Sequence, residues 1–441
     1  DQFSSVVYTQ ADANTSADID FTGVDDIDID GGDTSVTLES VVLTAADINF
    51  EFDLTEAQNV VVKTVTADTA GATSTISIES SGNVTINSGS ITAGGAVLIE
   101  ADEDIIVGSG AATNAIDASG GAYNVFLKAD LNNGGTGEIT DNAGIIKMGT
   151  GALLLSAGDG VGATGTGAIE TVGVTDFAAE ANSGGIFLNN STSGAINITT
   201  VDGQAGVTTV AGAISITNAA TQNIKVAQVV TAGSGGVTLN AGNVLDIDAV
   251  VTATGSTMDL DGKSIDIDAN VIAAGTTTLD ASDGSIDIAA SSRLTNSSGD
   301  ITMNAAGAIS LGDGANAAQA TVTNSGTGNI SITTTSAGNL TIDDDSILIG
   351  DGTLTINAAG NFTIATTNGA TQQIDSDGDI SITANGVGLT QTLDITGDAG
   401  GDRTLTVSNT STSGERTAIN VVTDQFSSVV YTQADANTSA D

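Results

Sequence analysis

The chain has 441 residues, and 54 acidic side chains face only 8 basic ones, which gives a formal net charge of −46. This balance excludes nucleic acid as a partner, because phosphate binding needs clustered Lys and Arg. With no His, Cys, Pro or Trp, the chain has no His-based catalytic triad, thiolate metal site or disulfide. Only 3% of its residues are aromatic, so any core consists of Val, Ile, Leu and Ala.

The opening segment, DQFSSVVYTQADANTSAD, returns without a mismatch as residues 424–441. Three explanations are open: a slice of a long tandem array, a junction in a polymer of identical units, or a cloning scar. The array is the preferred one, and it sets a long period of 423 residues. We therefore expect one continuous repeat unit over residues 1–423, with residues 424–441 as the start of the next copy.

Short alternating stretches fill the first half of the chain, among them TISIESSGNVTI (75–86), AVLIEADEDIIV (96–107) and GALLLSAG (151–158). Strict alternation over a few residues predicts short strands with one buried face. No run of 18 apolar residues occurs, so we expect no membrane span in this segment.

From about residue 186 the pattern becomes regular. An apolar-polar-apolar triplet follows a Gly-containing turn, and a short link then leads to a second triplet, as in GDITMNAAGAISL (299–311) and GTLTINAAGNFTI (352–364). The second apolar residue of each first triplet recurs at a variable step of 19 to 29 residues, from Ile216 to Val407. This period predicts an all-β parallel β-helix solenoid with coils of about 19–29 residues that stack their strands about 4.8 Å apart.

Acidic residues recur at one position of the second triplet. Asp246, Asp266 and Asp287 occupy its centre in three successive coils, and Asp248 and Asp268 follow two residues later. Stacking would bring these carboxylates about 5 Å apart, where like charges destabilise a sheet. Either salt screens them or a divalent cation bridges them, and calcium, which accepts carboxylate oxygens in flexible geometry, is the candidate. No other cofactor is expected.

Two further acidic segments are calcium candidates. They are DDIDIDGGD, which contains Asp28 and Asp30, and the triplet of aspartates at 343–345. The alternative for all of these residues is a solvated acidic surface.

Ser and Thr fill the outward slot of the first triplets, at positions 215, 238, 278, 302, 331, 355, 381 and 406. A hydroxyl column of this kind can bind ice or sugars, or it can simply supply good outward strand residues. The glycine-rich stretch 158–167 lacks the Lys of a phosphate-binding loop. With no His as a base, no cleft-forming insertion and few aromatic sugar platforms, the sequence predicts no enzyme.

The repeated triplet-Gly-triplet pattern over residues 186–407 resembles the repeats of filamentous-haemagglutinin-like adhesins and other large repetitive bacterial surface proteins. The resemblance implies a right-handed parallel β-helix in a secreted or cell-surface protein used for adhesion or as a stalk. We therefore expect a structural unit of a giant extracellular fibre that stacks end to end with identical units, as a covalent array or a homopolymer. A cell-surface glycan is a further expected partner. The alternatives are a cation-, glycan- or ice-binding module and a polysaccharide-active enzyme.

Overall fold

The computed structural model describes the backbone of the residues in these ranges: 6–10, 17–22, 27–31, 36–43, 49–54, 59–67, 75–87, 89, 91–110, 113–191, 194–312, 319–343, 346–364, 373–389, 394–396, 403–411 and 426–434. The side chains of residues 6–31 lie outside this description. Over the described ranges the chain is almost entirely β-strand, with no α-helix and one 3-10 turn at Gly165–Gly167. None of these residues forms a helix able to cross a membrane.

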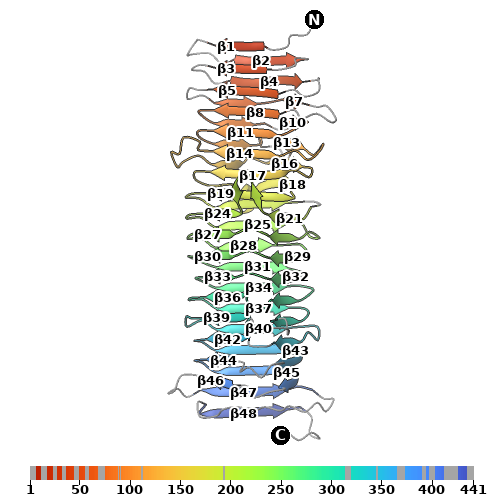
Figure 1. Cartoon of the computed structure of the whole chain (residues 1–441), viewed down its shortest axis with the longest axis vertical. Helices are drawn as coiled ribbons and strands as arrows, with labels where there is room; N and C mark the ends of the chain where they lie inside the picture. The colour runs from red at the N-terminus through yellow and green to blue at the C-terminus, as the bar shows by residue number, and fades with distance from the viewer. Residues whose placement is uncertain are drawn as a thin grey trace. The chain divides into compact units, whose positions relative to one another are not determined.

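The chain divides into two compact units, residues 1–234 and 235–441. Each is a β-solenoid in which parallel strands from successive coils stack on one another, as Figure 1 shows within each unit. The predicted fold class is therefore confirmed. The expectation of one continuous domain over residues 1–423 stays a prediction.

Unit 2 has three ladders of parallel strands. The first contains β28 (Val237–Asn240), β31 (Met258–Gly262), β34 (Thr277–Ala281), β37 (Ile301–Ala305), β40 (Ile330–Thr334), β43 (Leu354–Ile364), β45 (Ile380–Leu389), β47 (Thr404–Asn409) and β48 (Ser428–Gln433). The second contains β29 (Val244–Ile247), β32 (Ser264–Ile267), β35 (Ile286–Ile288), β38 (Ile309–Leu311) and β41 (Leu340–Ile342), and then the second halves of β43 and β45. The third contains β30 (Val251–Ala253), β33 (Val271–Ala273), β36 (Arg293–Asn296), β39 (Thr321–Asn324), β42 (Ile347–Gly350), β44 (Gln373–Ser376) and β46 (Asp394–Thr396).

The core of unit 2 consists of inward apolar columns, as the alternation predicts. Ile301 pairs with Ile330 and Ile330 with Leu354, and all three side chains are at most 1% exposed. The coil steps also span the predicted range, since Met258 pairs with Thr277 in a short coil and Ile301 with Ile330 in a long one. Turns between strands absorb this difference, so the ladder register is kept.

Unit 1 begins with strands of the same kind. One ladder contains β1 (Val6–Gln10), β3 (Ile27–Gly31), β5 (Asn49–Leu54), β8 (Thr75–Ser80), β11 (Val97–Ala101), β14 (Val125–Ala129), β17 (Ala152–Ala157) and β19 (Asp176–Ala181). A second begins with β2 (Ala17–Thr22) and β4 (Val36–Leu43), and continues in β6 (Val60–Val62), β9 (Val84–Ile86), β12 (Ile105–Val107) and β15 (Ile139–Asp141). The third branches from β4 into β7 (Val65–Ala67), β10 (Ile91–Ala93), β13 (Thr113–Ala118), β16 (Gly144–Met148) and β18 (Ile169–Val172).

The strand pairing of the three ladders in unit 1 changes near residues 157–207. The long strand β19 pairs at its start with β21 (Ile196–Ile198) and at its end with β24 (Val207–Thr209), so one ladder divides into two. Conversely, β20 (Ile186–Asn190) pairs with β18 and also forms a bridge with Val161. The strands that continue from here are β25 (Ile214–Asn218), β26 (Ile224–Val226) and β27 (Val230–Ala232).

A small hairpin lies on the outer face of unit 1. It consists of β22 (Thr200–Val201) and β23 (Gln204–Ala205), joined by Asp202 and Gly203, both at positive φ. Two consecutive positive φ values are typical of the tight turn that Asp-Gly favours. Val201 packs on Leu154 and Ala178, and Lys128 forms an ion pair with Asp202 at 3.0 Å.

Candidate functional site

Five of the predicted aspartates come together on one face of unit 2. Asp246 of β29 is the register partner of Asp266 of β32, which is in turn the partner of Asp287 of β35. Asp248 and Asp268 follow their strands and are exposed. These five residues form the first acidic column. The predicted alignment is confirmed, because alternation turns Leu245 and Ile247 inward and leaves the intervening carboxylate outward.

The first acidic column shows mutual repulsion. Burial raises the pKa of Asp266, and the negative charges of the other four carboxylates raise it further. The column ends at β38, where Ser310 takes the register position after Asp287. The stacked carboxylates concentrate negative charge on this face of unit 2.

A second acidic column, on β31 and β34, escaped the sequence analysis. It consists of Asp259, Asp261 and Asp280, with Asp261 and Asp280 in direct register. Burial, followed by the charges of Asp259 and Asp280, raises the pKa of Asp261 to about 6. Burial and Asp280 also raise the pKa of Asp259. The pattern MDLDG could have predicted this column. It was missed because Asp259 occupies the outward position that the sequence analysis assigned to Ser and Thr.

Unit 1 has a smaller acidic group, in turns rather than strands. Burial raises the pKa of Glu138, as do a hydrogen bond with Asp159 and the charges of Asp159 and Asp104. The Glu138 backbone N–H donates to Asp104 Oδ1 at 2.9 Å. Because these turns differ in length, no fixed sequence spacing could have predicted this group.

The metal prediction stays a prediction. Across the residues that the structure describes, no group of three or more acidic side chains is arranged to hold a metal ion. Asp28 and Asp30 are placed by backbone alone: they pair with Glu51 and Asp53 of β5, and their side chains lie outside the description. Asp344 and Asp345 are likewise outside the described residues.

The predicted hydroxyl column is in register over six coils of unit 2. It passes through Thr278, Thr302, Ser331, Thr355, Ser381 and Thr406. All six residues are half-buried on the outer face of their strands. Asp259 interrupts the column between Thr238 and Thr278. The result is an array of hydroxyls about 4.8 Å apart along the solenoid axis of this unit.

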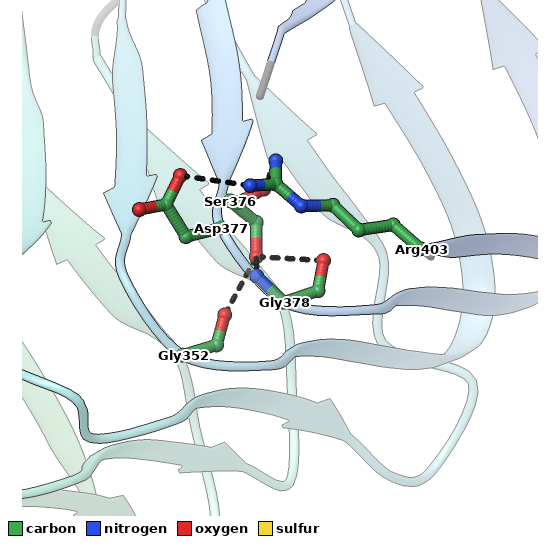
Figure 2. A network of polar contacts seen from close by, with 5 residues as sticks. All are labelled: Gly352, Ser376, Asp377, Gly378 and Arg403. Atoms are coloured by element: carbon green, nitrogen blue, oxygen red, sulfur yellow. Dashed lines mark hydrogen bonds and ion pairs between the residues drawn. The ribbon is translucent and has the colours of Figure 1, made fainter. Parts of the chain in front are cut away.

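A buried arginine holds the last described coil of unit 2 in place (Figure 2). The Arg403 side chain is 10% exposed, and its guanidinium donates to the Ser376 carbonyl at 3.1 Å and to Asp377 Oδ1 at 3.4 Å. The Ser376 hydroxyl in turn donates to the Gly352 carbonyl at 2.7 Å. The Arg403 carbonyl accepts hydrogen bonds from the Ser427 N–H and hydroxyl. Arg403 therefore links the preceding turn to the residue before β48.

Side-chain ladders hold the strand starts of both units. In unit 1 the Asn83 N–H donates to Asn59 Oδ1 and the Asp104 N–H to Asn83 Oδ1. In unit 2 the Asn329 N–H donates to Asp300 Oδ1, and the Thr353 N–H to Asn329 Oδ1. Each side chain thus satisfies a backbone donor of the next coil, which would otherwise be unpaired where the ladder begins.

Comparison with protein-family models, curated proteins and solved structures gives no match to this chain. The fold, the acidic columns and the strand register therefore carry the functional inference.

Proposed function

We propose that this chain is a structural repeat unit of an extracellular or cell-surface β-solenoid fibre, a stalk or an adhesin shaft, in which identical units follow end to end. One observation carries the proposal. Residues 428–433, which repeat residues 5–10, add to β47 as one more parallel strand in full register, from Thr404–Ser428 to Asn409–Gln433. The repeated segment thus forms the next step of the first ladder.

The role we propose is mechanical. Three parallel ladders and continuous apolar columns support stiffness, since every coil is hydrogen-bonded to its neighbours along its strands. The net charge of −46 supports lateral repulsion between fibres, because a large net charge of one sign keeps copies apart. The resemblance to filamentous-haemagglutinin-like adhesins supports the cell-surface setting. The proposal includes no enzymatic step.

A two-copy chain tests the proposal. Residues 1–423 are placed before residues 1–441 in one polypeptide, and its length is measured by small-angle scattering and electron microscopy beside the single copy. A shaft unit gives a straight particle about twice as long as the single copy, with no flexible joint. Two particles connected by a bend that varies from molecule to molecule would refute the shaft.

The hydroxyl column favours a second candidate, a surface that binds a glycan or ice. Its support is the uninterrupted register from Thr278 to Thr406. Thermal hysteresis and binding to a glycan array would test it, with Thr302→Val and Thr355→Val as the altered surface. A signal that is the same for this variant and the unaltered chain would exclude the column as the binding face.

A further inference from the structure

The same five-residue strand occurs twice and uses a different edge each time. β1 and residues 429–433 both read VVYTQ. β1 pairs with β3, which follows it in the chain, whereas β48 pairs with β47, which precedes it. Interior strands such as β45 pair on both sides, with the preceding β43 and the following β47. Together, the two copies of VVYTQ therefore make both of the pairings that one interior strand makes, one with the preceding strand and one with the following strand.

The apolar side chains of β48 are incompletely covered. Val429 is 47% exposed, although its register partner Leu405 is fully buried. Val430 is 43% exposed. Val430 takes the outward slot after Thr406, whereas Val429 stands out among the buried inward residues of the first ladder, and another coil stacked on β48 would cover it.

We propose that β48 receives β3 of a second copy of this chain, in the register that β1 gives to that strand, from Val429 with Ile27 to Gln433 with Gly31. In this contact β48 of the first copy takes the place of the second copy's own β1, because residues 429–433 and β1 have the same sequence. This inference rests on the proposed function: it names the partner of the end-to-end contact and the strands that make it.

The alternation of residue types continues through the proposed contact. The column through Ile380 and Leu405 leads to Val429, and the register of β1 then gives Ile27 and Phe50. The neighbouring apolar column leads from Val407 to Tyr431 and then to Ile29 and Phe52.

The outward positions follow the same register, and between the two columns Thr406 leads to Val430 and then to Asp28. Ser408 leads to Thr432 and then to Asp30. A slip of one residue would set Val429 against Asp28 and reverse every position, so the register is specified by the sequence.

Competition within each chain limits this exchange. β3 gains five residue pairs from the second copy only by losing the same five from its own β1, so the exchange at this ladder is close to neutral. The own β1 is tethered, and a short tether gives an effective concentration in the millimolar range. We therefore expect little assembly of the unaltered chain at micromolar concentration.

Paired proline substitutions test the contributions of β1 and β48 independently. Proline removes the backbone N–H, and two consecutive prolines remove one donor from each edge. Val7→Pro with Tyr8→Pro disables the competitor, so assembly, measured by sedimentation velocity, should begin at a concentration about 100-fold lower than for the unaltered chain. Adding Val430→Pro with Tyr431→Pro should return the variant to monomer. A folded V7P/Y8P chain that stays monomeric, or that assembles despite V430P/Y431P, contradicts the exchange.

Cysteine pairs test the register directly, because the chain has no native Cys. Asp28→Cys with Val430→Cys places the two Cα atoms about 4.8 Å apart across the contact, within disulfide range. Asp30→Cys with Val430→Cys is the matched slipped pair, beyond about 7 Å. We expect covalent multimers from the first pair and none from the second, in the V7P/Y8P background.

The chain with an unaltered β1, at about 0.5 mM, provides the same test should V7P/Y8P lose its far-UV strand signal. Equal cross-linking of the two cysteine pairs, or none, overturns the inference.

The two proposals can fail separately. A straight two-copy particle with no 28–430 cross-link removes the strand exchange and leaves the shaft. A 28–430 cross-link together with a variably bent two-copy particle removes the shaft and leaves the exchange.

Discussion

Replacing Asp261 by asparagine should stabilise unit 2 at neutral pH. Burial and the charges of Asp259 and Asp280 raise the pKa of Asp261 from 3.8 to about 6, so the folded state favours the protonated side chain. The stability that this proton contributes is present below pH 3.8 and is lost as the pH rises through 6. Asparagine fits the site, since Asn240 precedes Asp261 in the same register slot.

The magnitude follows from the pKa. A fully effective change from 3.8 to about 6 corresponds to about 3 kcal/mol. Asp261 is only half-buried, and solvent screening reduces this value to about 1 kcal/mol. For a unit of this size, that energy corresponds to an increase of about 2–4 °C in melting temperature.

The assay is calorimetry of Asp261→Asn and the unaltered chain at pH 8 and pH 4. The gain should appear at pH 8 and be much smaller at pH 4, where the folded state keeps the proton on Asp261 and the unfolded state is partly protonated. Asp283→Asn removes an exposed carboxylate outside the column and provides the control for net charge. The reasoning is refuted if Asp261→Asn gives no gain at pH 8, gives the same gain at pH 4, or is matched by Asp283→Asn.

Three further predictions concern other parts of unit 2. Leu279→Ala should cost about 3 kcal/mol in the free energy of unfolding, because Leu279 is fully buried; Thr278→Ala, on the outer face, should cost under about 0.5 kcal/mol. Arg403→Met removes the donors to Ser376 and Asp377 and should speed hydrogen exchange at the Ser427 amide; unchanged exchange would mean that the guanidinium does not hold the last described coil. If calcium bridges the first acidic column, calcium should raise the melting temperature, chelator should reverse the effect and Asp266→Asn should reduce it, whereas superimposable melts would remove the idea.

The sequence predicted the fold well because the alternation of apolar and polar residues within each short strand indicates which side chains are buried. In the triplet Ile286-Asp287-Ile288 the isoleucines are fully buried and the aspartate is exposed. The same alternation fixes register, so the alignment of Asp246 with Asp266 could be predicted from the sequence alone. Both results depend only on which neighbouring residues face inward.

Features that depend on the path of a turn could not be predicted in this way. Glu138 and Asp104 are 34 residues apart, yet they share a hydrogen bond because the intervening coil is long. Arg403 looked like one scattered base among eight, since nothing in its neighbours shows that its guanidinium turns inward to Ser376. The division of one ladder at β19 into β21 and β24 depends on two strands sharing one partner, which alternation does not encode.

The coils of unit 2 differ in length, as the steps from 258 to 277 and from 301 to 330 show, yet neither step breaks a ladder. Insertions and deletions in the turns between strands therefore leave the ladder register intact, whereas the insertion or deletion of one residue within a strand shifts it. The turns can therefore change in length and sequence, and the surface residues of each coil can change with them. An engineer could use the same turns to display foreign peptides at a regular spacing.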